Sequence, residues 1–255
     1  MNVTEVAEYY NRILCINDFA ADPSNNGLQV CGNEEKICKK IAFAVDVSLS
    51  SITMAAEQHA NMLIVHHGLS WGGEPRRFCG STGQRMAMLM KNELALYAMH
   101  LPLDAHTVYG NNAQLAELMQ LQQRKMFFAY HGMNIGIIGQ AAAPLSLETL
   151  GAMAGNGQSF RCFESPLREK TVRKVAVISG GGGLDGLEAA IAEQCDVLVT
   201  GEFDHTMYHV VQENKIHVIA LGHYNSEVHG VKNLQKLAAE ELNMETLFLD
   251  IPTGL

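Results

Sequence analysis

Membrane anchors, cysteine pairs and signal sequences are the features that this sequence has least of. No apolar stretch approaches the roughly 20 residues that a membrane-spanning helix needs. The 6 cysteines include no Cys-x-x-Cys pair, which argues against a zinc finger. Residues 1–5 are polar and acidic and lack the basic region that begins a signal peptide. We therefore expect a cytoplasmic protein with reduced cysteines.

Basic charge is also scarce in this chain of 255 residues. It has 18 Lys and Arg against 27 Asp and Glu, which gives a formal net charge of −9. Nucleic-acid-binding proteins usually carry a basic stripe on their surface. The composition therefore disfavours nucleic acid as a partner, and it provides no segment for a membrane. The length is sufficient to bury a hydrophobic core without covalent crosslinks.

What the sequence does contain is an alternation of apolar runs and amphipathic stretches. Strand, helix and strand patterns alternate over about residues 41–121 and again from residue 175, which predicts parallel sheets with right-handed crossovers. Residues 127–140 are aromatic and β-branched, and they predict a hairpin. We expect an α/β fold with two halves, residues 1–124 and 171–255. A small β-rich insert and linker, residues 125–170, lies between them.

Two adjacent histidines, His66 and His67, end the apolar run that begins at Met62. Such a run predicts a short buried strand, and open α/β sheets bind ligands beyond the carboxyl ends of their strands. Neutral imidazole is the commonest metal ligand among side chains. Because adjacent strand residues point to opposite faces, the pair suggests two metal ions, or one ion and a second histidine that supports it.

Two more apolar runs are followed at once by polar groups. His100 and Asp104 follow residues 94–99, and His223 and Glu227 follow residues 217–221. If Asn225 or Ser226 caps the next helix, His223 and Glu227 face one point at its start. Imidazole combined with carboxylate favours Zn, Mn, Fe or Ni over Ca or Mg. A carboxylate, unlike imidazole, bridges two cations, so Glu227 or Asp104 is the candidate bridge.

Two further segments follow predicted strands. Residues 179–183 are Ser followed by four glycines, which suits either a tight turn or a phosphate cradle at a helix N-terminus. Glu202 and His205 follow the strand near residue 198, at the sheet edge that carries the other candidates. The alternative role of that segment is helix capping by Asp204 or Thr206.

Taken together, these motifs resemble the NIF3-like dinuclear metal proteins, also labelled GTP cyclohydrolase I type 2 homologues. The matching segments span nearly the whole chain: 25–30, 44–48, 66–69, 100–104, 179–182, 200–202 and 222–227. The resemblance implies that two divalent ions (Zn, Mn, Fe or Ni) are bound per chain. The ligands that it implies are His66, His67, Asp104, His223 and Glu227. Glu227 would bridge the ions, with His67 and Asp104 on one ion and His66 and His223 on the other.

The same resemblance implies a toroidal homohexamer and a loop at the site shaped by Asn26 and Gly27. It places Glu202 near the metals as a candidate general base, and His205 is the second catalytic candidate. The expected chemistry is metal-assisted hydrolysis of a nucleotide or another phosphorylated compound, including a GTP cyclohydrolase reaction. A metal carrier, insertion or storage protein would use the same five ligands without turnover. A hexameric scaffold with a structural metal site is a third hypothesis.

Overall fold

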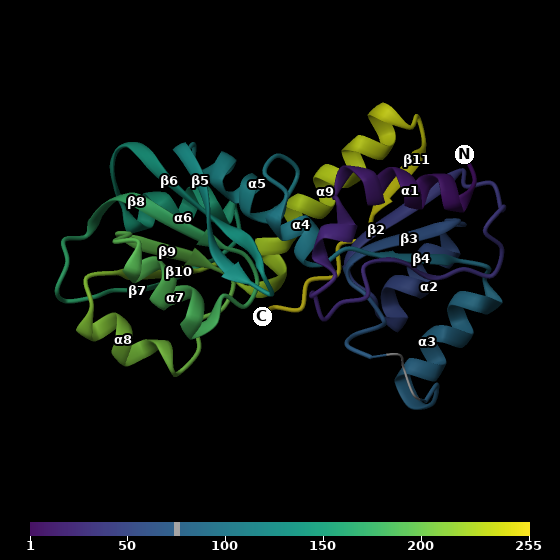
Figure 1. Ribbon diagram of the computed structural model, residues 1–255, viewed down its shortest axis with the longest axis horizontal. Coiled ribbons are helices and arrows are strands. Elements are labelled where there is room, and N and C mark those ends of the chain that lie inside the picture. The colour runs from purple at the N-terminus through teal and green to yellow at the C-terminus, as the bar shows by residue number, and fades with distance from the viewer. Residues whose placement is uncertain (74–76) are drawn as a thin grey trace. The chain divides into compact units, whose positions relative to one another are not determined.

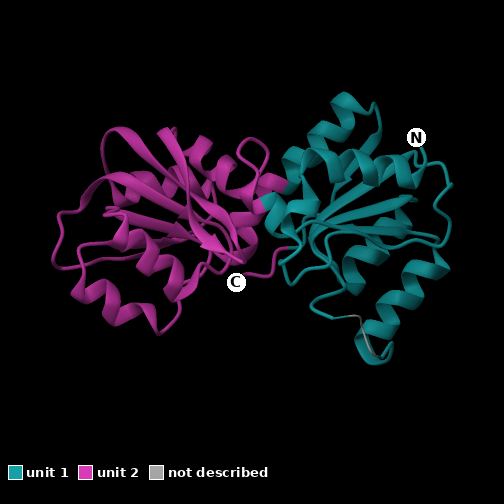
Figure 2. Cartoon of the chain, viewed as in Figure 1, with its two compact units in different colours: residues 1–103, 231–251 teal, residues 104–230, 252–255 magenta. Residues whose placement is uncertain are grey.

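The computed structural model describes residues 1–73 and 77–255 of the chain, which form two compact units (Figures 1 and 2). Unit 1 comprises residues 1–103 and 231–251, and unit 2 comprises residues 104–230 and 252–255. Two of the three boundaries fall within helices, α4 (Leu101–Ala105) and α9 (His223–Glu241), and the third lies between Ile251 and Pro252. Among the described residues, no helix is long and apolar enough to span a bilayer.

Unit 1 is built on a five-stranded sheet with the order β1-β4-β3-β2-β11. Its strands are β1 (Gly27–Val30), β2 (Lys40–Asp46), β3 (Met62–His67), β4 (Ala95–Ala98) and β11 (Glu245–Phe248). The four strands β4, β3, β2 and β11 are mutually parallel, and β1 is antiparallel at the edge. The parallel strands β2, β3 and β4 are almost wholly buried, as expected when helices cover both faces of a sheet.

Helices cover both faces of this first sheet (Figure 1). On one face, α2 (Leu49–Glu57) and α3 (Gly80–Lys91) bury Ile52 and Leu89 against alternate residues of the strands. On the other face lies α1 (Val3–Ile13), which begins with a capping box formed by Asn2 and Glu5. Its Tyr10 packs edge-on against Phe43 of β2.

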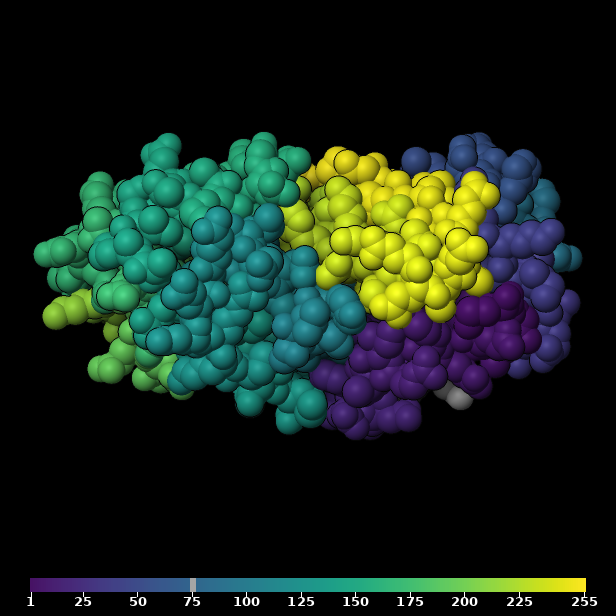
Figure 3. All heavy atoms as spheres, turned by 90° about the horizontal axis from the view of Figure 1, so that it is seen from above, coloured from purple at the N-terminus to yellow at the C-terminus, as the bar shows by residue number. Residues whose placement is uncertain are grey.

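The C-terminal segment of the chain returns to this first unit. Figure 3 shows residues of α9 beside the N-terminal helix α1. The hydroxyl of Tyr10 donates a hydrogen bond to the carbonyl of Leu234 at 2.9 Å, and Tyr9 donates to Glu241 at 2.6 Å. Strand β11 then pairs in parallel with β2, with Leu247 opposite Ala42. The first unit therefore combines segments from both ends of the chain.

Unit 2 is built on a six-stranded sheet with the order β5-β6-β8-β9-β10-β7. Its strands are β5 (Gln122–Tyr130), β6 (Met133–Ser146), β7 (Arg161–Phe163), β8 (Thr171–Ile178), β9 (Val197–Thr200) and β10 (His217–Ala220). The central strands β8, β9 and β10 are parallel, and the strands outside them join antiparallel. The fold is therefore mixed α/β with two mostly parallel sheets, as the sequence predicts.

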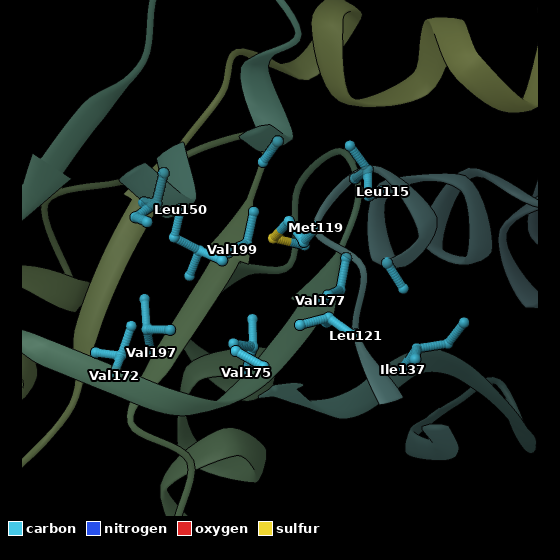
Figure 4. Close-up of a cluster of buried hydrophobic side chains, with 14 of the residues drawn as sticks. Leu115, Met119, Leu121, Ile137, Leu150, Val172, Val175, Val177, Val197 and Val199 are labelled. Atoms are coloured by element: carbon cyan, nitrogen blue, oxygen red, sulfur yellow. The ribbon is translucent and has the colours of Figure 1, made fainter. Parts of the chain in front are cut away.

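Two helical layers enclose the second sheet. On one face, α5 (Asn111–Leu118) and α6 (Leu147–Gly155) pack Leu115 and Leu150 against Val177 and Val199 (Figure 4). On the other face, α7 (Gly183–Ala192) and α8 (Met207–Glu213) cover the alternate residues of the same strands. Valine and isoleucine dominate the strands because β-branched side chains pack well on a pleated surface.

The hairpin predicted at residues 127–140 is present as β5 and β6. Strand β6 pairs with β8, so the hairpin extends the second sheet. The compact units change at residues 103/104, 230/231 and 251/252, and β11 lies in the first sheet because it pairs with β2. Whether residues 125–170 form a domain of their own stays a prediction.

Candidate metal-binding groups

The candidate ligands follow strands in both units. His66 and His67 end β3, and His100 follows β4 by two residues. In unit 2, Ser179 follows β8, Gly201 follows β9 and His223 follows β10 by three residues. The carboxyl ends of parallel strands meet at one edge of a sheet, which is the edge where α/β proteins bind ligands. Each unit therefore presents polar groups at the edge that the sequence predicts.

The unit 1 imidazoles form a compact cluster. The ring centroids of His66 and His67 are 4.5 Å apart, and the ring of His100 lies 5.3 Å and 5.7 Å from them. One nitrogen from each ring lies within 4.8 Å of the others, an arrangement that could hold a metal ion. Strand alternation predicted that His66 and His67 point apart. Their rings nevertheless lie together at the end of β3.

Each of these rings has its Nδ1 atom held by an oxygen acceptor. His66 Nδ1 is 2.8 Å from the carbonyl oxygen of Met99, and His67 Nδ1 is 2.8 Å from Oδ1 of Asp46. An acceptor at Nδ1 places the hydrogen there, so the lone pair of the neutral ring is on Nε2. Metal-ligating histidines are oriented by such contacts. Asp46 is able to reach His67 because the two residues are register partners on β2 and β3.

The third ring, His100, is held by a fully buried carboxylate. Oδ1 of Asp22 accepts from His100 Nδ1 at 2.9 Å, and the Asp22 side chain is 0% exposed. Oδ2 of Asp22 accepts from Asn26 Nδ2 and from the backbone N–H of Leu101. Burial acts to raise the pKa of Asp22, but the hydrogen bonds from His100 and Asn26 outweigh it and hold the pKa below its usual value.

Asn26 and Gly27 shape this part of unit 1, as the family resemblance implies. Oδ1 of Asn26 accepts the backbone N–H of His100 at 2.7 Å. Gly27 has φ +108°, a conformation that favours glycine. This loop therefore fixes both the backbone and the side chain of His100.

In unit 2, Asp104 lies in α4 and is buried. Its Oδ1 accepts from Asn111 Nδ2 at 2.9 Å and from Ser179 Oγ at 3.0 Å. The neighbouring Asn112 donates to the carbonyls of Asp104 and Ile135 and accepts the backbone N–H of Ser179 at 2.6 Å. The Asn111 amide and the Ser179 hydroxyl therefore hold the carboxylate of Asp104, and the Asn112 amide links the backbone of Asp104 to the end of β8.

His223 lies between two carboxylates of unit 2. Its Nδ1 is 2.6 Å from Oε1 of Glu202, and its Nε2 is 3.2 Å from Oε1 of the buried Glu227. Burial disfavours the charged ring, but hydrogen bonds and negative charge from Glu227 and then Glu202 outweigh it and raise the pKa of His223 to about 9. In the metal-free protein His223 is therefore protonated at neutral pH.

Helix α9 begins at His223, several residues before the start predicted from Asn225 or Ser226. Both of those side chains have other partners. Asn225 Nδ2 donates to the Leu221 carbonyl, and Ser226 Oγ accepts the backbone N–H of Gly180 at 2.8 Å. His223 and Glu227 thus lie one above the other at the start of the helix, one turn apart, as their i, i+4 spacing requires.

The glycine segment after β8 packs directly against these ligands. Gly180 has φ +62°, and a Cβ at this position would collide with the carboxylate of Glu227. A Cβ on Gly201 would approach within 2.9 Å of the His223 Cα. The structure therefore gives Gly180 a role in close packing beside Glu227. A phosphate-binding role for residues 180–183 stays a prediction.

The two catalytic candidates differ in their surroundings. Glu202 accepts a hydrogen bond from Nδ1 of His223, a contact that orients this candidate ligand. His205 is exposed in the turn before α8, and its carbonyl accepts from the backbone N–H of Tyr208. Asp204 Oδ1 accepts the Thr206 N–H at 2.8 Å in the turn before α8, but the N-cap residue Thr206 makes no side-chain capping hydrogen bond, so the predicted cap by Asp204 or Thr206 is not formed. The catalytic roles of Glu202 and His205 stay predictions.

Sequence reasoning did not identify Asp22, Asp46 and Asn111 as partners of candidate ligands. The sequence does give an indication of the role of Asp46, since this residue ends a strand predicted to neighbour the His66–His67 strand. It gives no indication for Asp22, because Asp22 lies in a loop and contacts a ring 78 residues away.

The fold and these donor groups define a two-sheet α/β protein equipped with histidines and carboxylates that could hold metal ions. The family described as Duf34/NIF3 (NGG1p interacting factor 3) matches residues 1–253, and the chain belongs to this family.

Individual relatives agree with this assignment over their whole lengths. A protein of Pyrococcus abyssi named GTP cyclohydrolase 1 type 2 homolog is 40% identical over 258 residues, covering 100% of both chains. The crystal structure of TTHA1606 from Thermus thermophilus is 34% identical, covers 100% of both chains and superimposes with a TM-score of 0.87. Reduced HcgD from Methanocaldococcus jannaschii is 29% identical over 98% of both chains, with a TM-score of 0.86.

Proposed function

We propose that this protein is a metal-dependent hydrolase that acts on a nucleotide or another phosphorylated compound. Its ligands are His66, His67, Asp104, His223 and Glu227, which together hold two divalent ions. The observation that carries the proposal is the fixed orientation of the imidazoles. Met99 O and Asp46 hold Nδ1 of His66 and His67, so Nε2 of each neutral ring carries the lone pair.

The donor set suits a hydrolytic centre. The two carboxylates among the five ligands are buried, and a carboxylate has two oxygens with which to bridge two cations. Imidazole with carboxylate fits Zn, Mn, Fe or Ni. When bound, a pair of such ions makes water a nucleophile at neutral pH and stabilises the attacking and leaving oxygens. The names of the curated relatives support GTP as the first substrate to test.

The test is GTP turnover by metal-reconstituted protein, with formate and phosphate measured separately. Glu227→Ala removes the proposed bridge, and Glu213→Ala, at an exposed position of α8, is the matched control. Formate released by the natural chain and the control, and lost in Glu227→Ala, would support a cyclohydrolase. Phosphate alone would support a phosphohydrolase. Two bound metals per chain with no product from GTP or other nucleotides would contradict a nucleotide hydrolase and would leave metal handling or another phosphorylated substrate to be tested.

A metal carrier, insertion or storage protein is the second candidate, and one contact favours it. Glu202, the predicted general base, already accepts a hydrogen bond from His223. A carrier needs no general base. Transfer of bound zinc to a chelating acceptor, measured beside GTP turnover, separates the candidates: a carrier would release metal rapidly and show no product.

The proposed hexamer gives a separate expectation. Six chains of 27.9 kDa would sediment as one particle of about six times that mass. Analytical ultracentrifugation with and without a chelator tests this state. If a chelator dissociates the hexamer and no turnover is found, the third hypothesis of a structural metal in a scaffold is favoured.

A further inference from the structure

Trp71, the only tryptophan in the chain, is a large aromatic side chain that stays 42% exposed beside the unit 1 histidines. Its ring lies edge-on to that of His100 with a centroid distance of 4.9 Å, and 6.0 Å from that of His67. All three residues belong to unit 1. The proposed metal ligands leave the indole unused, and an apolar ring in water gains nothing from the hydrophobic effect. Its exposure at this position therefore calls for an explanation of its own.

The indole of Trp71 is fixed in its orientation. Its Nε1–H donates to the carbonyl of Gly68 at 3.0 Å. The backbone of Trp71 forms a β-bridge with Ser24, and the N–H of Gly72 donates to the carbonyl of Pro23. A tryptophan side chain has only two torsion angles, and here both its ring and its backbone are held, so little conformational entropy is lost when a ligand packs against it.

The loop that carries Trp71 is itself held by side-chain amides. Oε1 of Gln29, on β1, accepts the backbone N–H of Leu69 at 2.7 Å and that of Ser70 at 3.3 Å. Nδ2 of Asn25 donates to the hydroxyl of Ser70, and the backbone N–H of Asn25 donates to the Ser70 carbonyl. The exposed ring is therefore mounted on a rigid part of unit 1.

The exposed indole offers a ligand a π face. Because the indole N–H is already bonded to the carbonyl of Gly68, the ring is not positioned to read the hydrogen-bonding edge of a ligand. Aromatic side chains bind nucleobases by stacking, which tolerates different bases because every base has a π face. A purine has two fused rings and overlaps an indole more fully than a pyrimidine does. This surface therefore suits a purine better than a pyrimidine.

We propose that Trp71 is the stacking platform for the base of a purine nucleotide that binds at the carboxyl edge of the first sheet. The inference rests on the proposed function in that the ligand is a nucleotide, and it adds the residue that positions the base. Trp71 separates purines from pyrimidines, and it does not separate guanine from adenine. Stacking is made before the reaction as well as during it, so Trp71 contributes affinity more than rate.

The first measurement uses the fluorescence of Trp71 itself, since no other tryptophan contributes to the emission. The metal-reconstituted full chain is mixed with GTP, ATP, UTP or inorganic triphosphate, and the emission is followed by stopped flow before turnover. GTP and ATP should quench the emission with similar affinities, and UTP should bind more weakly. Inorganic triphosphate should leave the emission unchanged.

Substitutions test the same contact by calorimetry. Trp71→Ala should weaken the binding of GTP and ATP by about tenfold, as expected for the loss of one stacked base, and should leave inorganic triphosphate unaffected. Trp71→Phe keeps a π face and should bind GTP within about threefold of the natural chain. Where GTP is turned over, Trp71→Ala should raise KM by about the same factor as it weakens binding, with kcat little changed.

Ile37→Ala is the matched control for these variants. Ile37 is an apolar side chain of the same unit, 57% exposed, and it precedes β2 at the amino ends of the parallel strands. This substitution should leave the affinity for GTP unchanged. Circular dichroism spectra show whether each variant is folded.

The outcomes separate this inference from the proposed function. If GTP binds without quenching and Trp71→Ala binds it as tightly as the natural chain, the platform is overturned and the hydrolase stands. The same result with a smaller sedimenting particle would assign Trp71 to contacts between chains. If purine nucleotides quench the emission and Trp71→Ala loses affinity, but no product forms, the platform stands and the hydrolase fails. If no nucleotide binds, the platform and a nucleotide hydrolase are overturned together.

Discussion

Oε1 of Glu202 lies 2.6 Å from Nδ1 of His223, the shorter of the two contacts that this ring makes with carboxylates. A carboxylate at Nδ1 increases the basicity of the opposite nitrogen and fixes the plane of the ring. Glu202 thus orients a candidate ligand. Its role as a general base, which the family resemblance implies, stays a prediction.

Substituting Glu202 by Gln should lower zinc affinity by about tenfold, because the orienting charge is lost while the shape is kept. Isothermal titration with zinc measures this. Glu188→Gln, exposed on α7, is the control and should leave the affinity unchanged. Unaltered zinc affinity combined with complete loss of turnover would instead assign Glu202 as the general base.

The stability of the metal-free protein should depend on the ionisation of His223. The folded pKa of about 9 lies above the ordinary value of 6.5. The protonated ring therefore stabilises the fold fully below pH 6.5, and this contribution is lost as the pH rises from there through about 9. Urea unfolding in the presence of a chelator, between about pH 6 and 10, should show this decline. The decline should be smaller in His223→Gln, and an equal slope in both proteins would contradict the assignment.

Two glycines of one turn should differ in their tolerance of alanine. Gly180 and Gly183 have similar φ, +62° and +58°, but only Gly180 faces a side chain, that of Glu227. Gly183→Ala should therefore cost about 1 kcal/mol of backbone strain. Gly180→Ala should cost at least about 2 kcal/mol, because Glu227 is also displaced. Urea unfolding measures both variants, and equal losses would argue against close packing at Gly180.

Removing the buried side-chain amide of Asn112 should clearly lower the free energy of unfolding. Asn112→Ala deletes two donated hydrogen bonds and leaves the buried N–H of Ser179 without its acceptor. We expect a loss of about 2–3 kcal/mol in the free energy of unfolding. Gln114→Ala on the same helix should change it by less than about 0.5 kcal/mol. A loss at Asn112 no larger than that at Gln114 would show that water replaces these bonds.

The local elements could be read from the sequence because each depends on neighbouring residues. The strand ending at His66–His67 and the hairpin at residues 127–140 were both predicted and are present. The pairing of β11 with β2 was not predictable, since it joins residues about 200 positions apart and leaves no periodic signal.

In the candidate site, too, the residues marked by a local sequence pattern were predicted, and those positioned by distant contacts were not. His66, His67 and His223 stand out because each follows an apolar run, which is a local pattern. Asp22 and Asn26 hold His100 from 78 and 74 positions away in the sequence, and the Ser226 hydroxyl accepts the backbone N–H of Gly180 instead of capping its own helix. Such partners depend on tertiary packing, so a single sequence shows the ligands more clearly than the residues that orient them.

The parallel pairing of β11 with β2 also affects how the chain is made. A ribosome releases the first four strands of unit 1 long before residues 245–248, and over a hundred residues of unit 2 are synthesised in between. Domains generally fold as units during synthesis, with earlier segments first. In this protein most of unit 2 has been synthesised while the edge of β2 that pairs with β11 is still unpaired, so unit 1 cannot be completed first. The first sheet begun during translation is therefore the last to be finished.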